Sequence, residues 1–185
     1  MLVARMIAPI HTLGPGSRIG LWIQGCSKNC QGCISKELQR FDERKNIPVD
    51  MLVSLIRQEA DRNNCNRITI SGGDPFEQPE ELYELLFQIR KRFEDILVYT
   101  GYTMQEIEAS VIMRACIPLI DVLVDGRYVE NENTGRSRIY GSDNQKMIIR
   151  NEKLAKDYEE FEKGEHVLET FIHNDKVITV GIQER

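Results

Sequence analysis

Three cysteines lie close together in the stretch GCSKNCQGC, which occupies positions 25–33. Cys26, Cys30 and Cys33 follow a C-x3-C-x2-C spacing, and no fourth cysteine lies nearby. Cysteine thiolates are ligands for zinc and for iron–sulfur clusters. The spacing therefore predicts a metal site that takes three thiolates from one loop.

Two kinds of metal site compete for these three thiols. A structural zinc site needs a fourth protein ligand, and the candidates are His11, His166, His173 or a distant cysteine, none at a helpful spacing. An iron–sulfur cluster held by three thiolates leaves one iron open, so that a ligand or substrate can bind there. A third alternative is an electron-transfer protein that uses the cluster alone, and such a protein would normally supply four thiolates.

Composition bounds the class of protein. The 185 residues are 41% hydrophobic and 29% charged, which is ordinary for one globular domain, and the net charge of -5 argues against a general nucleic-acid-binding protein. The N-terminal stretch 1–16 is too short and too interrupted for a signal peptide or a membrane span. We therefore expect a cytoplasmic protein without nucleic-acid or membrane partners, whose cysteines serve metal or reactive chemistry rather than disulfides. The isolated Cys65 and Cys116 are expected to be buried apolar residues.

Regular elements must position the cysteine loop, and they alternate along the chain. Asp50 is expected to cap the first helix, and Thr103 with Glu106 forms the signature of a capping box. Strands that alternate with helices predict an α/β fold with a mainly parallel sheet. Strands are expected at 19–24, 67–71, 95–100, 120–126 and 145–150, and helices at 49–63, 79–94 and 103–115.

The segments that follow these strands hold the residues of chemical interest. In a parallel sheet the carboxyl ends of the strands meet at one edge, so segments that follow strands should form one site. The polar stretch 127–144 has no clear periodicity, and a loop of this length is typically functional or disordered. The segments that follow strands are the cysteine loop, Gly72-Gly73-Asp74, Thr100-Gly101-Tyr102 and Asp125-Gly126.

The composition changes after Arg150. Residues 151–165 are rich in charge and predict a solvated helix. Residues 166–182 alternate around Asn174-Asp175 in the manner of a β-hairpin. We therefore expect a core domain of residues 1–150 and a small C-terminal appendage of residues 151–185.

The cysteine spacing resembles the signature of the radical S-adenosylmethionine (radical SAM) superfamily. The resemblance implies that Cys26, Cys30 and Cys33 hold a [4Fe-4S] cluster and that S-adenosyl-L-methionine binds the fourth iron. Further motifs resemble, in the same order, those of the activating proteins of anaerobic class III ribonucleotide reductases. These motifs are GPG at 14–16, QGCSKNCQGC at 24–33, SGGDP at 71–75, TGYT at 100–103, DVLVDGRY at 121–128 and GSDNQ at 141–145.

This resemblance implies a fold and a reaction. The implied fold is a partial, open (β/α) barrel of the radical SAM type with mainly parallel strands. In the implied reaction, a flavodoxin- or ferredoxin-like reductant supplies one electron, S-adenosylmethionine is cleaved to methionine and a 5'-deoxyadenosyl radical, and this radical takes a hydrogen atom from a glycine of the partner reductase. The cofactor carries the redox chemistry, so no general base is required.

The resemblance also implies which residues contact the cofactor. Glycines let the backbone approach a ligand closely, although a Gly-Gly pair also suits an ordinary strand-to-helix turn. Asp74 adds a negative charge that suits the cofactor's ammonium group. The resemblance makes Tyr102 a cofactor contact, although its side chain could also serve only to pack against its neighbours. The implied contacts are Gly32, Cys33, Ile34, Gly72, Gly73, Asp74 and Tyr102.

A few positions depart from the family pattern. Ile34-Ser35 stand where an aromatic residue and Asn are common, Leu13 stands where Asn or Asp is common, and Tyr140 stands where Arg is common. None of these changes removes a cluster ligand. They leave another glycyl-radical enzyme, or a peptide, as an alternative substrate.

Overall fold

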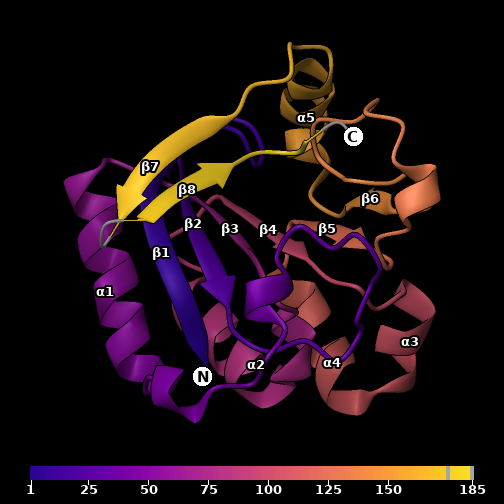
Figure 1. The fold of residues 1–185 in the computed structure, drawn as a ribbon. Coiled ribbons are helices and arrows are strands. Elements are labelled where there is room, and N and C mark those ends of the chain that lie inside the picture. The colour runs from indigo at the N-terminus through magenta and orange to yellow at the C-terminus, as the bar shows by residue number, and fades with distance from the viewer. Residues whose placement is uncertain (174–175, 184–185) are drawn as a thin grey trace.

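A computed structural model of the chain describes residues 1–173 and 176–183. Its main sheet has six strands in the order β1-β2-β3-β4-β5-β6 (Figure 1). The middle strands β2 to β5 are parallel, and β1 and β6 pair antiparallel at the two edges. The expected α/β fold with a mainly parallel sheet is confirmed. The strands are β1 (Val3–Ile10), β2 (Arg18–Ile23), β3 (Arg67–Gly72), β4 (Asp95–Tyr99), β5 (Val122–Asp125) and β6 (Lys146–Ile149).

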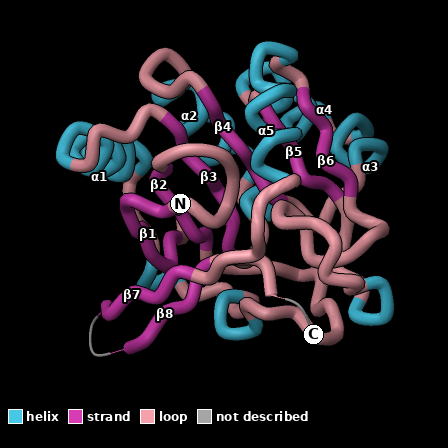
Figure 2. Tube along the Cα trace, turned by 90° about the horizontal axis from the view of Figure 1, so that it is seen from above, coloured by secondary structure: helices cyan, strands magenta, loops and turns pink. Residues whose placement is uncertain are grey.

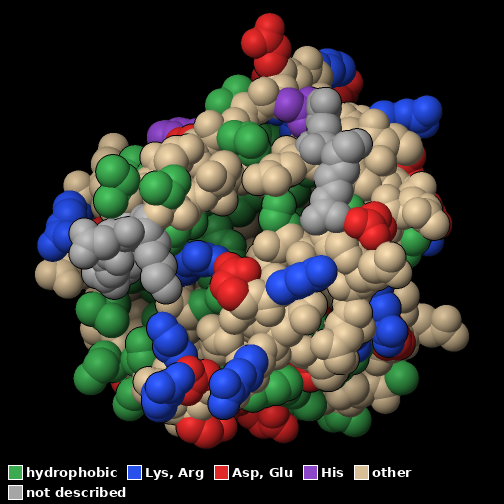
Figure 3. All heavy atoms as spheres, in the orientation of Figure 1, with side chains coloured by type: hydrophobic (Ala, Val, Ile, Leu, Met, Phe, Trp, Pro, Cys, Tyr) green, Lys and Arg blue, Asp and Glu red, His purple; other side chains and the backbone are tan. Residues whose placement is uncertain are grey.

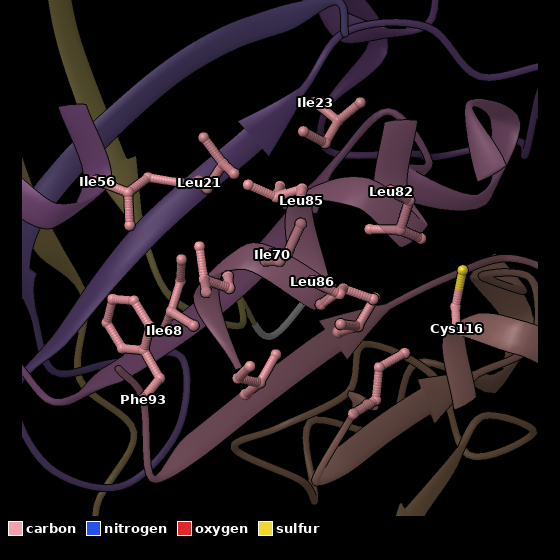
Figure 4. Packing of buried hydrophobic residues seen from close by; sticks show 14 of the residues in the cluster. Leu21, Ile23, Ile56, Ile68, Ile70, Leu82, Leu85, Leu86, Phe93 and Cys116 are labelled. Atoms are coloured by element: carbon pink, nitrogen blue, oxygen red, sulfur yellow. The ribbon is translucent and has the colours of Figure 1, made fainter. Parts of the chain in front are cut away.

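One face of the sheet is covered by helices α1 to α4 (Figures 1 and 2). Branched aliphatic residues of β3, Ile68 and Ile70, pack against Leu82 and Leu86 of α2, and all four are fully buried (Figure 4). Cys65 and Cys116 are buried in the same cluster, as expected. The helices are α1 (Val49–Arg62), α2 (Pro79–Ile89), α3 (Met104–Ala109) and α4 (Val111–Cys116).

The opposite face of the sheet is covered at its two ends by the C-terminal segment. Helix α5 (Ala155–Glu162) buries Tyr158 in a cluster with residues of β4 and β5. The hairpin of β7 (Glu169–His173) and β8 (Lys176–Val180) buries Val180 in a cluster with Trp22 of β2. The expected helix and hairpin are confirmed, and the turn at Asn174-Asp175 lies outside the described residues.

The structure corrects two helix predictions. The helix expected over 79–94 ends at Ile89, with Arg90 as its C-cap, and the Arg90 side chain donates hydrogen bonds to the Phe93 carbonyl (2.6 Å) and to the Asp121 carboxylate (2.5 Å). The helix expected over 103–115 is broken at Ser110, whose backbone is extended and whose hydroxyl accepts a hydrogen bond from the Met113 amide (3.5 Å). Serine competes for backbone hydrogen bonds in this way and starts a second helix.

The helix starts were predicted with mixed success. The capping box of Thr103 and Glu106 is present, as the sequence predicts. The prediction for Asp50 is wrong: Pro48 occupies the N-cap position, and Asp50 lies in the first turn and accepts a hydrogen bond from Gln88 (2.8 Å). The first strand, β1, was not expected from the sequence. None of the helices in the described residues combines the length and the apolar character needed to cross a bilayer.

Candidate functional site

The cysteine loop leaves the carboxyl end of β2 and returns to it. Its base is closed by hydrogen bonds from the Gly25 amide to the Leu38 carbonyl (2.8 Å) and from the Cys26 amide to the Gln39 carbonyl (2.9 Å). Gly25 and Gly32 have positive φ angles of 104° and 72°, which glycine adopts without strain. The loop therefore holds its three cysteines between two fixed ends.

All three cysteines line one cavity of about 350 Å³, which appears as a recess in Figure 3. This volume is in the range of small-molecule sites. The cavity lies on the face of the sheet opposite helices α1 to α4, between the hairpin and the loop that follows β5. The expected convergence of strand ends is confirmed, because the end of β3 and the segments that follow β3, β4 and β5 contribute Gly72, Gly73, Asp74, Thr100, Gly101 and Gly126.

The Gly-Gly segment joins the end of β3 to the cysteine loop. The Gly73 amide donates to the Ile23 carbonyl (2.7 Å), and the Asp74 amide donates to the Gly25 carbonyl (2.9 Å). A Cβ atom on Gly73 would lie 2.2 Å from the Gly25 carbonyl oxygen, and one on Gly72 would lie 2.3 Å from the Ile23 backbone. The chain's own backbone therefore leaves no room for side chains here, independently of any ligand.

The Asp74 side chain connects two of the segments that form the site. Its carboxylate accepts hydrogen bonds from the Phe76 amide (3.0 Å), the Thr100 hydroxyl (2.8 Å) and the Gly101 amide (2.8 Å). It is 1% exposed, and this burial raises its pKa to about 6 against the opposing effect of the hydrogen bonds. Asp74 therefore ties the end of β3 to the end of β4.

Cys26 lies beside two carboxylates. Its sulfur and the carboxylate oxygens of Asp74 and Glu77 all lie within 4.8 Å of one another. Burial raises the pKa of the Cys26 thiol to about 11, and the two carboxylates add to the rise. A metal must displace the proton of such a thiol when it binds. The oxygens of Asp74 already accept three hydrogen bonds, so this trio makes a poor metal site by itself.

The arrangement of the cysteines fits a cluster better than a single zinc ion. The sulfurs of Cys26, Cys30 and Cys33 do not all lie within 4.8 Å of one another, whereas tetrahedral zinc with Zn–S bonds of about 2.3 Å holds its sulfurs about 3.8 Å apart. No histidine is placed to be a fourth ligand among the described residues, because the His11 ring is engaged by Glu169 (2.8 Å) and His166 is exposed. The side chain of His173 lies outside the described residues. The three thiols thus suit a larger group with one open position.

Of the two expected contacts Ile34 and Tyr102, only Ile34 lines the cavity. Ile34 is 59% exposed and lines the cavity. Tyr102 does not line it, and its ring instead lies 3.0 Å from the ammonium group of Lys28, a residue of the cysteine loop that does line the cavity. Burial and the neighbouring Glu77 raise the pKa of Tyr102 to about 12. Tyr102 therefore contacts the cysteine loop through Lys28 and not through the cavity.

Several residues of the cavity wall were not anticipated. Trp22 was expected only as a strand residue, yet it faces away from the helices and lines the cavity. Residues 177–183 of the C-terminal segment form another part of the wall. Only the alternation of β2 could have placed Trp22 on this face, and nothing in the sequence shows where a distant hairpin docks.

Comparison with known proteins agrees with this site. Residues 12–148, most of the chain, match the sequence family described as a 4Fe-4S single cluster domain, and the chain belongs to it. An anaerobic ribonucleoside-triphosphate reductase-activating protein of Pasteurella multocida is 34% identical over 139 residues, which are 71% of this chain and 87% of the relative.

Two further relatives bear the same name. The protein of Escherichia coli (strain K12) is 33% identical over 137 residues, covering 71% of this chain and 88% of the relative. The protein of Enterobacteria phage T4 is 28% identical over 138 residues, covering 72% and 85%. Within the 4Fe-4S domains, this chain is thus a member of the family of anaerobic ribonucleoside-triphosphate reductase-activating proteins.

Proposed function

We propose that this chain is a radical SAM enzyme that generates a glycyl radical on an anaerobic ribonucleotide reductase. The observation that carries the proposal is one cavity lined by three free cysteines, without a fourth cysteine or histidine ligand in the described part of the chain. A three-thiol set leaves one metal position for a substrate. Membership in the family of activating proteins supplies the class of partner.

In this proposal Cys26, Cys30 and Cys33 hold a [4Fe-4S] cluster. S-Adenosylmethionine would be held by Gly32 and Ile34 of the cysteine loop and by Gly72, Gly73 and Asp74 at the end of β3, which line the same cavity. The cluster and S-adenosylmethionine together supply one-electron reductive cleavage, which yields methionine and an oxidant able to take a hydrogen atom from glycine. Tyr102 acts indirectly, by holding Lys28 of the cysteine loop.

In this proposal the protein positions the cysteine loop and shields the reactive intermediate from water. The Gly-Gly segment fixes the cysteine loop against β3, and Asp74 fixes the ends of β3 and β4 relative to each other. Apolar walls such as Leu13 and Trp22 exclude water from a reactive intermediate. No proton-transfer residue is needed, because the oxidant removes a whole hydrogen atom.

The finer architecture belongs to the same proposal. We infer that the sheet forms a partial, open (β/α) barrel of the radical SAM type and that residues 1–150 form the core domain. The C-terminal residues 151–185 are an addition to it. The enzyme works in the cytoplasm, where a flavodoxin- or ferredoxin-like protein is its reductant.

The test is the formation of a glycyl radical on the anaerobic reductase of the same organism. The reconstituted and reduced protein is mixed with the reductase and S-adenosylmethionine under anaerobic conditions, and the radical is measured by electron paramagnetic resonance. We expect a doublet signal on the reductase that requires S-adenosylmethionine. A reductase that stays without signal while S-adenosylmethionine is cleaved would point to another glycyl-radical enzyme or a peptide as the substrate.

A further inference from the structure

Glu77 is tied to the cysteine loop from a neighbouring segment. It is the last residue of the short helix η3 (Pro75–Glu77), which follows the Gly-Gly-Asp segment. Its carboxylate oxygen Oε1 accepts hydrogen bonds from the amide (3.1 Å) and the hydroxyl (2.5 Å) of Ser27. Ser27 directly follows Cys26 in the chain. Glu77 therefore holds the part of the loop that carries one of the three thiols.

The short helix η3 is held in place by contacts other than those of Glu77. Phe76 is fully buried in the main hydrophobic cluster, and its amide donates a hydrogen bond to the Asp74 carboxylate (3.0 Å). Pro75 is buried as well. A substitution that changes only the charge of Glu77 should therefore leave this segment in its place.

The carboxylate of Glu77 also lies close to a cluster ligand. The sulfur of Cys26 and a carboxylate oxygen of Glu77 lie within 4.8 Å of each other. Glu77 is only partly exposed, so water and salt screen its charge less than they screen a charge on the open surface. A negative charge thus stands beside one of the three thiols.

The other charged groups around Cys26 are engaged differently. The Asp74 carboxylate accepts hydrogen bonds from three donors, which offset its charge. The Lys28 ammonium group lies against the ring of Tyr102 (3.0 Å), and the Lys28 amide donates a hydrogen bond to the Cys26 sulfur (3.5 Å). Net charge and hydrogen bonds to the sulfurs both set the reduction potential of an iron–sulfur cluster. The amide of Lys28 favours the reduced cluster, whereas the charge of Glu77 opposes it.

We propose that Glu77 lowers the reduction potential of the [4Fe-4S] cluster by placing a negative charge beside Cys26. This inference rests on the cluster of the proposed function and not on the identity of the partner protein. Reduction adds one electron to the cluster, so a neighbouring negative charge disfavours the reduced form. A reduced cluster of lower potential is a stronger reductant for the sulfonium group of S-adenosylmethionine. Glu77 does not line the cavity, so it acts through Cys26 as a positioning residue.

Glu77→Gln tests the proposal, because it removes the charge and keeps an oxygen that can accept from Ser27. Wild type and variant are reconstituted anaerobically with iron and sulfide and poised at a series of solution potentials at one pH, without S-adenosylmethionine. The reduced cluster is measured by electron paramagnetic resonance. At a given solution potential we expect an about tenfold larger ratio of reduced to oxidised cluster in the variant, equivalent to a rise of about 59 mV for a one-electron couple. An unchanged midpoint would overturn the proposal.

Two further variants separate the charge from the shape of the loop. Glu77→Asp keeps the charge, so its midpoint should stay closer to that of the wild type than the midpoint of Glu77→Gln. Glu84→Gln makes the same change at an exposed position of α2, on the face of the sheet opposite the cavity, and should leave the midpoint unchanged. An equal shift in either of these variants would contradict a local effect of the Glu77 charge.

The amount of bound iron does not decide the result. The midpoint is a property of each cluster that is present, so a variant that retains less iron still yields it. A Glu77→Gln variant that binds no iron at all would show that Glu77 is needed to form the site rather than to set its potential, and would overturn the proposal.

The outcome can be separated from the proposed function. Formation of 5'-deoxyadenosine by the wild-type protein reports the proposed chemistry alone. A raised midpoint in Glu77→Gln without cleavage by the wild type would remove the proposed function and keep the role of Glu77. Normal cleavage by the wild type combined with an unchanged midpoint would remove only the role of Glu77.

Discussion

Gly73 shows how closely the cysteine loop and β3 approach each other. The contact between its backbone and Gly25 joins residues far apart in the sequence. The cysteines and the Gly-Gly-Asp segment could be recognised from the sequence because each motif is contiguous. What Gly73 and Asp74 do inside the fold could not be predicted, because their partners, Gly25 and Thr100, come from other strand ends.

Gly73→Ala is expected to displace the cysteine loop. The added Cβ would meet the Gly25 carbonyl at 2.2 Å, a contact that must be relieved by moving backbone. Overpacking of this kind destabilises by about 1–3 kcal/mol. We expect a loss of this size in denaturant unfolding, together with a fall in iron retained per chain after anaerobic reconstitution.

Gly101→Ala is the matched control for this change. Its Cβ would meet the flexible side chain of Lys28 at 3.1 Å, so the neighbour can move aside. This variant should retain iron close to the wild-type amount. Equal loss of iron in both variants would contradict the role assigned to the contact between Gly73 and Gly25.

At the scale of elements, the helices α1 to α4 and the strands β2 to β6 followed from hydrophobic periodicity, whereas β1 was not predicted. Helix α3 ends where Ser110 bonds the backbone of the next helix. The docking of the hairpin could not be predicted, because it depends on Glu169 meeting His11 and Thr12 at the end of β1, more than 150 residues away along the chain.

Glu169→Gln is expected to loosen the hairpin in a pH-dependent way. Burial acts to raise the pKa of Glu169, but hydrogen bonds from His11 and Thr12 outweigh it and hold the pKa below its usual range. A carboxylate with a lowered pKa stabilises the fold above its unfolded pKa of about 4.3, and this stability is lost as the pH falls through the folded value. The wild type should therefore be more stable than the variant at pH 7, and the difference should shrink below pH 4.

Denaturant unfolding at both pH values measures this difference. Glu165→Gln, at an exposed position shortly before β7, is the control and should behave as the wild type does. A difference between wild type and Glu169→Gln that is the same at both pH values would contradict an ionised anchor.

At the scale of the whole molecule, a buried network ties the C-terminal segment to the sheet. Arg18 of β2 forms an ion pair with Asp95 of β4 (2.6 Å), and both side chains are fully buried. The Tyr158 hydroxyl of α5 donates a hydrogen bond to the same carboxylate (3.0 Å). The sequence suggested a solvated helix here, and half of the residues of α5 are exposed. The burial of Tyr158 could not be predicted, because it depends on how α5 packs against β4 and β5.

Tyr158→Phe is expected to weaken this network. The change removes one donor from a buried charged acceptor, and hydrogen bonds to charged groups contribute about 1.5–3 kcal/mol. We expect a loss of about 2 kcal/mol in the free energy of unfolding. Tyr83→Phe, in a tyrosine that stacks against the exposed Phe87 at 6.2 Å, is the control and should cost much less. Equal effects would contradict the role of the Tyr158 hydroxyl.

The central claim is that three cysteines and S-adenosylmethionine form one reactive centre. The most direct measurement is made anaerobically: the protein is reconstituted with iron and sulfide, reduced, supplied with S-adenosylmethionine and assayed for 5'-deoxyadenosine. We predict that the wild type forms this product and that Cys26→Ala does not. A wild-type protein with a confirmed, reduced four-iron cluster that forms no 5'-deoxyadenosine would contradict the claim and would make electron transfer the better description.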